Sequence, residues 1–196
     1  MLNSIIKSSI ENTISESENI WVGTYLEDMI PLTSDERGRC GEEVVFEIIK
    51  YYTDFPVEWY RDKNINLGDG KYDTKINNFR VEVKTAMRGN NNKSWQHDVI
   101  RSEEVWDKLI FVDFDLDGVW FTIINHNQMV FKRGIRNEIF KKSATPCKGG
   151  WKFDMSMATF ERGIKNGITF FYPIKTEVRE IENNFSIFLR RNFGKI

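Results

Sequence analysis

The sequence predicts a single α/β domain, and three patterns predict it. Residues 37–52 carry apolar side chains at helical spacing, residues 71–85 alternate apolar and polar side chains about a turn, and residues 108–124 contain two apolar runs joined by a turn. A chain of 196 residues can bury a substantial core within one domain. We therefore expect helices packed on a sheet, with no internal repeat and no second domain across 1–196.

The first part of the chain is expected to be helical. Residues 3–30 are rich in Ser, Asn and Glu and predict one or two helices that pack on the core through residues such as Trp21. The apolar residues at helical spacing in 37–52 are Val45, Ile48, Ile49 and Tyr52. Glu42 shares their face and leans inward. Alternatively, Glu42 and Glu43 stand in the first turn and only favour the helix dipole.

Residues 71–85 predict a β-hairpin whose turn is Asn77-Asn78, because asparagine tolerates a positive φ. This turn pairs Ile76 with Phe79, Lys75 with Arg80, Thr74 with Val81, and Asp73 with Glu82. Directly opposed Cβ atoms are about 4.5–5.5 Å apart, and like charges there destabilise the pairing. A divalent cation would reverse that effect; otherwise the charges form a solvated face.

The two faces of the second strand differ in chemistry. Arg80, Glu82 and Lys84 project to one side, whereas Phe79, Val81 and Val83 project towards a core. Two carboxylates supply the oxygen ligands that Mg²⁺ prefers, and Mn²⁺ is expected to substitute for it. A lysine beside them can orient a water and neutralise charge on a phosphate. The pattern therefore indicates metal-dependent phosphodiester hydrolysis.

With Asp73 as the first acid and Glu82-Val83-Lys84 as the E-x-K element, the sequence resembles the PD-(D/E)xK nuclease superfamily, which includes many type II restriction endonucleases. The proline of the family motif is absent, because Tyr72 precedes the aspartate. The resemblance covers about residues 38–124. It implies a restriction-endonuclease-like fold, with a mixed β-sheet core of four or five strands flanked by helices.

The resemblance also implies a role for each site residue. Asp73 and Glu82 would bind the metal together with the Val83 carbonyl, and Lys84 would position the attacking water. Glu42 resembles the glutamate that the family places on a helix before the catalytic hairpin, where it supports the metal directly or through water. Glu43 is a weaker substitute, because it shares its face with Phe46 and Glu47.

Residues 108–114 and 119–124 predict a buried central hairpin, because the first run is apolar on both faces. Before it lie Gln96 and His97, where several families of this superfamily carry a Gln or Gln-His segment that approaches the nucleic-acid backbone. We expect Gln96 and His97 to contact a phosphate or assist metal binding. The alternative for His97 is a surface or hinge histidine.

The C-terminal region predicts a helix over 155–165, a strand over 168–172 that Pro173 ends, and a last helix capped by Thr176 and closed by Gly194. The apolar stripe of that last helix is Val178, Ile181, Phe185, Phe188 and Leu189. Such a stripe is usually core, but it could also pack against a second subunit.

The net charge of −1 hides an uneven distribution. Residues 1–60 carry 4 basic and 12 acidic residues, whereas residues 132–196 carry 14 and 6, a net charge of +8. A basic region can neutralise phosphates, although a solvated lysine-rich surface is the simpler alternative. The candidate contacts lie in two glycine-containing segments and are Arg88, Lys93, Lys148 and Lys152.

The composition also narrows the setting of the protein. No apolar stretch approaches the roughly 18 residues of a membrane span, and the first residues lack the pattern of a secretory signal. Only Cys40 and Cys147 are present, too few for a zinc cage, and free cysteines suit a reducing cytoplasm.

The expected function is a Mg²⁺-dependent endodeoxyribonuclease, a type II restriction endonuclease acting as a homodimer on double-stranded DNA. A repair or junction-resolving nuclease would use the same site. The alternative from another class is a non-catalytic nucleic-acid-binding or assembly subunit that keeps the fold. The retained Asp73, Glu82 and Lys84 argue against that alternative.

Overall fold

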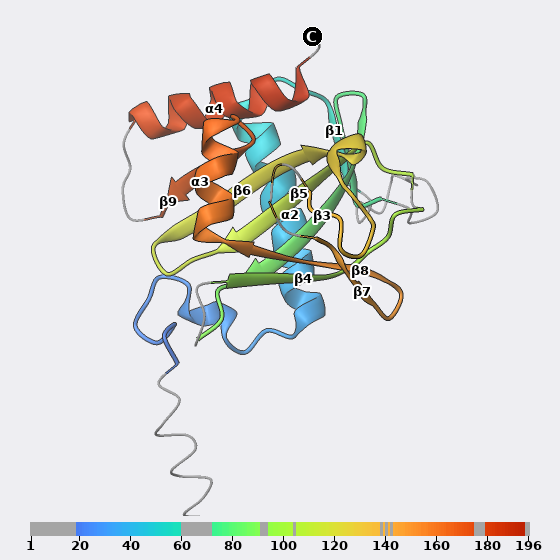
Figure 1. Cartoon of the computed structure of the whole chain (residues 1–196). Helices are drawn as coiled ribbons and strands as arrows, with labels where there is room; N and C mark the ends of the chain where they lie inside the picture. The colour runs from blue at the N-terminus through green and yellow to red at the C-terminus, as the bar shows by residue number, and fades with distance from the viewer. Residues whose placement is uncertain are drawn as a thin grey trace, which may run out of the picture.

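The computed structural model describes residues 19–59, 72–90, 94–103, 105–137, 139, 141, 143–174 and 179–194. In chain order its elements are η1 (Glu27–Met29), α2 (Ser34–Tyr52), β1 (Val57–Trp59), β2 (Thr74–Ile76), β3 (Phe79–Met87), β4 (Ser94–Ile100), β5 (Lys108–Phe114), β6 (Gly118–Asn125), η3 (His126–Gln128), β7 (Thr145–Cys147), β8 (Gly150–Ser156), α3 (Met157–Lys165), β9 (Thr169–Pro173) and α4 (Arg179–Phe193) (Figure 1). None of the helices described is both long and apolar enough to cross a membrane.

The main sheet confirms the α/β class with a mixed sheet. Its strand order in the described chain is β1-β2-β3-β5-β6-β9, in which β3 and β5 are parallel and the other neighbours antiparallel. The expected four or five strands are therefore too few, because the short β1 and the late β9 extend the two edges. A second, three-stranded antiparallel sheet has the order β4-β8-β7.

Both predicted hairpins are confirmed. Asn77 has a φ of +56°, and its turn pairs Ile76 with Phe79 and Thr74 with Val81. β5 and β6 form the central antiparallel pair, and every residue of β5 is buried. The turn chemistry and the apolar runs therefore determine the register of β2 with β3 and that of β5 with β6.

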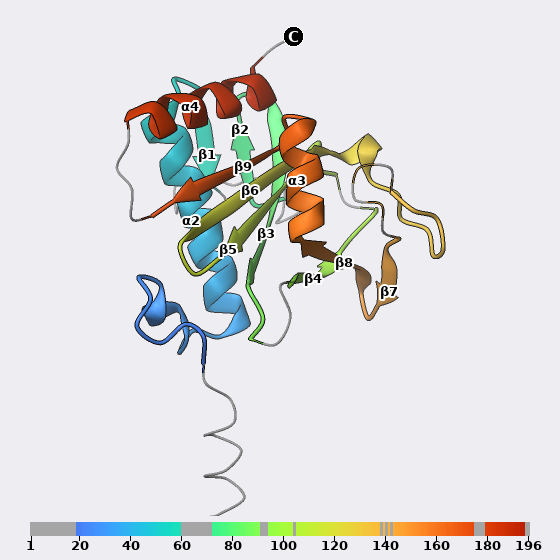
Figure 2. The same ribbon diagram turned by 60° about the vertical axis from the view of Figure 1, so that its left-hand side comes forward.

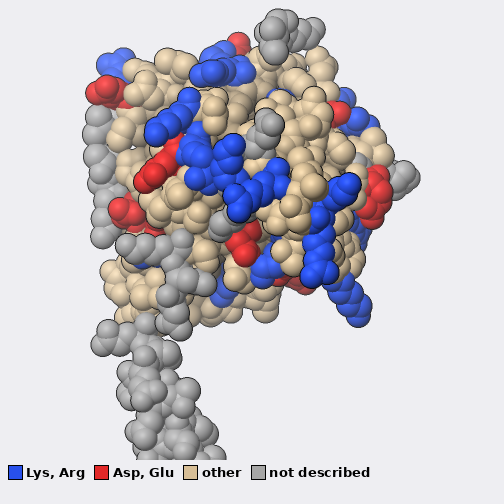
Figure 3. Space-filling model, viewed as in Figure 1, with Lys and Arg blue, Asp and Glu red and all other residues tan. Residues whose placement is uncertain are grey.

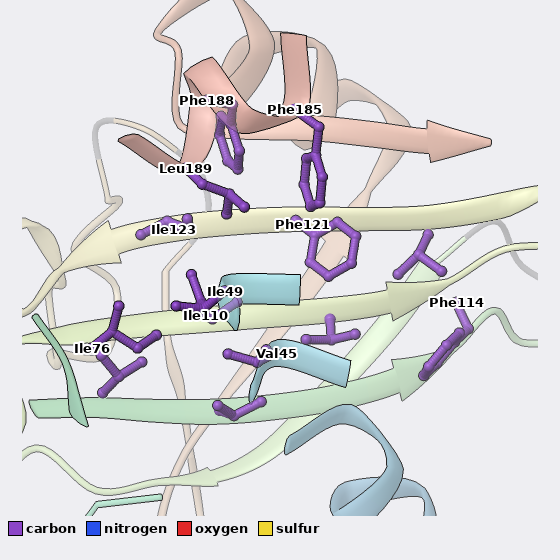
Figure 4. Close-up of a cluster of buried hydrophobic side chains, with 14 of the residues drawn as sticks. Val45, Ile49, Ile76, Ile110, Phe114, Phe121, Ile123, Phe185, Phe188 and Leu189 are labelled. Atoms are coloured by element: carbon purple, nitrogen blue, oxygen red, sulfur yellow. The ribbon is translucent and has the colours of Figure 1, made fainter. Parts of the chain in front are cut away.

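The main sheet has a hydrophobic core on each face (Figure 2). α2 and α4 cover one face, where Phe185 of α4 packs on Phe121 of β6 with ring centroids 5.1 Å apart (Figure 4). α3 and the small sheet cover the other face, where Phe160 stacks on Trp120. The buried stripe of α4 thus belongs to the core of its own chain, which contradicts its use against a second subunit; Thr176 and Val178 lie outside the described residues.

Three predicted boundaries differ from the structure. α2 begins at Ser34 because Thr33 and Glu36 form a capping box. α3 begins at Met157, since Met155 is still in β8 and pairs with Trp95. Residues 19–33 form turns and η1 rather than long helices, with Gly23 at a φ of +75°, although Trp21 is buried as expected. Residues 1–18 lie outside the described chain.

Candidate active site

Asp73 immediately precedes β2, which is much shorter than its neighbour β3. β2 pairs only with Phe79, Arg80 and Val81, so the following residues of β3 have an edge that no described strand covers. Asp73 caps this edge: its N–H donates to the Val81 carbonyl (3.0 Å), and its Oδ2 accepts from the Val83 N–H (2.8 Å). The predicted opposition of Asp73 and Glu82 is therefore modified, because Asp73 turns its carboxylate towards the backbone of Val83.

Glu82 and Lys84 project from the same face of β3, as the alternation predicts. Their Cα partners on β5 are Leu109 and Phe111, both buried. The Lys84 Nζ lies 2.6 Å from the Glu82 Oε1, and the two side chains are 25% and 9% exposed. The Val83 N–H donates to Asp73, and the Val83 carbonyl therefore points to the same open edge of β3.

Glu42 reaches the same place from α2. A Cβ on Gly41 would lie only 1.9 Å from the Thr85 Oγ1, so the absence of a side chain lets α2 approach β3 closely. Glu42 is buried, and its Oε2 accepts a 3.4 Å hydrogen bond from the Trp59 indole. α2 starts eight residues before Glu42, which excludes the explanation that Glu42 serves the helix dipole, and Glu43 is exposed.

The acids repel one another. Burial of its carboxyl, together with repulsion from Glu82 and Glu42, raises the pKa of Asp73 to about 8. The Val83 N–H and the Lys84 ammonium oppose that rise but do not cancel it. Ionisation of all three carboxyl groups around one ammonium group would leave an excess of negative charge, which a cation would neutralise.

Glu42, Asp73, Val83 and Lys84 face one cleft of about 510 Å³ between the N-terminal half of α2, the open edge of β3, and β4, and Glu82 contacts Lys84 beside it. Its lining residues are Ser34, Asp35, Gly38, Arg39, Glu42, Asp73, Val83, Lys84, Thr85, Gln96, His97, Asp98 and Val99. A second hollow of about 300 Å³ adjoins it at Ser34, Thr85 and Gln96. We call the larger of these two hollows, the one of about 510 Å³, the acidic cleft.

The donor set of the acidic cleft fits a hard divalent cation. Its carboxylate oxygens suit Mg²⁺ or Mn²⁺, and neither described cysteine lines the cleft. Among the described residues no group of three or more His, Cys, Asp or Glu side chains is placed to hold a metal ion. In this arrangement the Lys84 ammonium contacts Glu82, and the Val83 N–H donates to Asp73.

Gln96 and His97 point to opposite sides of β4. Gln96 is exposed at the cleft, where its Oε1 accepts from the Lys152 Nζ (3.1 Å). His97 is buried, its Nε2 lies 2.7 Å from the Asp113 Oδ1, and its ring packs on Phe111. The alternative of a surface histidine is therefore wrong, whereas the expected contact of His97 with a phosphate or metal stays a prediction.

A signal for the buried pair of His97 and Asp113 was present in the sequence. Asp113 is an acid within a fully apolar strand, and a buried carboxylate requires a hydrogen-bond partner. Trp95, His97 and Ile100 all point inward from β4. Only the pairing of distant segments identifies His97 as the partner, because the two strands are not neighbours in either sheet.

The four basic candidates differ in their surroundings. Arg88 forms a 3.0 Å ion pair with Asp115 at the loop after β3, and its nucleic-acid contact stays a prediction. Lys152 is shared among Gln96, Asp98 (3.6 Å) and Asp154 (3.9 Å). Lys148 is exposed in the β7–β8 turn, and Lys93 lies outside the described residues.

Basic side chains gather on the face that carries α3, the segment between η3 and β7, and β8 (Figure 3). We call the exposed basic residues of these segments and of the β7–β8 turn the basic face. They are Lys132, Arg133, Arg136, Lys141, Lys148 and Lys165. Part of the positive C-terminal third is thus presented together on this face. Comparison with protein-family models, curated proteins and solved structures finds no match to this chain.

Proposed function

We propose that this chain is a Mg²⁺-dependent endodeoxyribonuclease of the restriction-endonuclease-like class, acting as a homodimer on double-stranded DNA. The observation that carries the proposal is the convergence of Glu42, Asp73 and Lys84 on one cleft at an open strand edge, with Glu82 beside them in an ion pair with Lys84. The order of a helix, an acid-bearing antiparallel hairpin and a mixed sheet also agrees with that class.

In this proposal the residues of the chain divide the work. Asp73 and Glu82, with the Val83 carbonyl, hold the cation, and Glu42 supports it from α2. Bound Mg²⁺ lowers the pKa of a water and neutralises charge on the phosphate. Lys84, which contacts Glu82 in this structure, would orient the attacking water and stabilise negative charge at phosphorus.

Incubation with supercoiled, linear and single-stranded DNA, with and without Mg²⁺, tests the proposal. Cleavage is expected only with the metal, and end-mapping distinguishes discrete fragments of a restriction enzyme from nonspecific degradation. Lys84→Ala should lower the cleavage rate by about 10²-fold or more while DNA binding persists. A Lys84→Ala protein that cuts at the wild-type rate would refute the assigned mechanism.

The ion pair between Lys84 and Glu82 also favours a second candidate, a non-catalytic subunit that binds nucleic acid, since it occupies a carboxylate oxygen. That protein would bind DNA and leave it intact under every metal condition. The same incubations, followed by a binding assay, therefore separate the two functions.

A further inference from the structure

A β-bulge interrupts β4 beside the acidic cleft. His97 lies opposite Phe153 and Ile100 opposite Trp151, so Asp98 and Val99 together face a single residue of β8. Val99 adopts a φ of +57°, in the left-handed region. A β-branched side chain is rare and strained in that conformation, which persists only where the surroundings impose it.

The bulge changes which side chains reach the cleft. In a regular strand Asp98 would point outward and Val99 inward. Here both residues line the acidic cleft, Val99 is 37% exposed, and Ile100 returns to the core with no exposed surface. The extra residue therefore adds an exposed apolar side chain to a wall that otherwise presents mainly charged and polar groups.

The β7–β8 turn packs directly against the bulge. A Cβ on Gly150 would lie 2.8 Å from the Ile100 carbonyl oxygen and 3.2 Å from the Val99 carbonyl carbon. Gly149, at a φ of +87°, would place its Cβ 3.7 Å from the Val99 Cγ1. The two glycines thus allow a close approach of the β7–β8 turn to the strained backbone of Val99.

We propose that Val99 is a substrate-positioning residue, whose isopropyl group is held over the acidic cleft to contact the sugar carbons of the nucleotide bound at Asp73, Glu82 and Lys84. The inference rests on the proposed nuclease function and adds a determinant of substrate binding to it. The carboxylates and the lysine serve the cation and the phosphate, whereas the carbon atoms of a deoxyribose pack favourably against an apolar side chain. Val99 supplies that partner.

The substitution Val99→Asn tests this role, because asparagine tolerates a positive φ and is similar in size but polar. We expect the melting temperature to rise by about 2–4 °C as the strain is relieved. The kcat/KM for a duplex oligonucleotide with a mapped cleavage site should fall at least tenfold, chiefly through KM. The stabilisation by Mg²⁺ should equal that of the wild type.

Val105→Asn is the matched control, because Val105 is 47% exposed, has no positive φ and does not line the acidic cleft. It should not raise the melting temperature, and its kcat/KM should equal that of the wild type. Val99→Gly should repeat the loss of kcat/KM with a melting temperature no lower than that of the wild type.

Three results would overturn the inference. Wild-type kcat/KM in Val99→Asn would remove the role of Val99 and leave the nuclease function intact. A fall in both melting temperature and kcat/KM in both Val99 variants would make Val99 an ordinary structural residue. A wild-type protein that cleaves no DNA would remove the proposed function, and the inference with it.

Discussion

The surroundings of Asp73 disfavour its ionised form. Its carboxylate is held between Glu82 and Glu42, and its pKa is raised to about 8 by burial and by these two acids. A group arranged in this way weakens the folded state unless a ligand compensates, which is common at functional sites. The stability of the protein should therefore report directly on the state of Asp73.

The first prediction concerns pH. Because the folded pKa lies above the unfolded value of 3.8, the contribution of Asp73 to stability is fully present below about pH 4 and is lost as the pH rises towards 8. In EDTA, Asp73→Asn should therefore melt above the wild type at pH 8, and the difference should shrink near pH 4. Thermal melts of both proteins across this range measure the effect.

Asp54→Asn is the control of opposite sign. The hydrogen bond from Arg190 lowers the pKa of the exposed Asp54, so its contribution to stability is present above the unfolded pKa and lost as the pH falls. This variant should not melt above the wild type at pH 8. A difference between Asp73→Asn and wild type that is equal at pH 4 and pH 8 would contradict the raised pKa.

The second prediction concerns metal. Mg²⁺ or Mn²⁺ should raise the melting temperature, because a ligand that binds only the folded state stabilises it by about 2.7 kcal/mol at 100 times its Kd. The increase should be larger at pH 8 than at pH 6, since the cation requires ionised Asp73. Asp73→Asn should abolish most of it. If millimolar divalent ions leave the wild type, Asp73→Asn and Glu82→Gln unchanged, the acids are a structural cluster.

At the residue scale, local sequence patterns located the acids but not their partners. The turn at Asn77 and strict alternation along β3 placed Asp73, Glu82 and Lys84 together, because both are short-range properties. The contact of Asp73 with the Val83 N–H depends on where β2 begins, which alternation does not specify. The pairing of His97 with Asp113 depends on the packing of one sheet on another.

At the scale of elements, the site depends on the approach of α2 to β3. Gly41 faces Thr85 across this contact, and the next residue, Glu42, enters the cleft. The capping box of Thr33 and Glu36, a Thr-x-x-Glu pattern in the sequence, was a usable signal for the helix start. The close approach of α2 to β3 had no comparable signal in the sequence. Gly41 indicates close packing only once Thr85 is known to be its neighbour.

The third prediction tests this approach. Gly41→Ala places a Cβ against the Thr85 side chain, so it should lower the free energy of unfolding by about 1–3 kcal/mol and displace Glu42. Gly38→Ala is the matched change three residues earlier in α2, where a Cβ would meet nothing within 4 Å. It should instead stabilise by about 0.5–1 kcal/mol. Denaturant titrations measure both, and equal effects would show that α2 does not require Gly41.

At the scale of the molecule, the charges are separated between the acidic cleft and the basic face. The sequence predicted the positive C-terminal third, but it did not predict which lysines remain available. Ion pairs formed by folding decide this: Arg88 is bound by Asp115, and Lys152 is shared with Asp98 and Asp154, whereas Lys148 is exposed. The small sheet that presents Lys148 and Lys152 arises from strands distant in sequence, which no local pattern specified.

The fourth prediction follows from this separation. In a Lys84→Ala background, which prevents cleavage, Lys148→Ala should weaken binding of all DNA sequences and lower the slope of log K against log salt by about one unit for each phosphate that is no longer neutralised. Lys152→Ala should have a smaller effect, because nearby carboxylates already offset its charge. Lys50→Ala is the control, since Lys50 lies on α2, outside the basic face, and pairs with Glu47. Equal weakening by Lys50→Ala and Lys148→Ala would mean that DNA responds to net charge alone and that the basic face has no specific role.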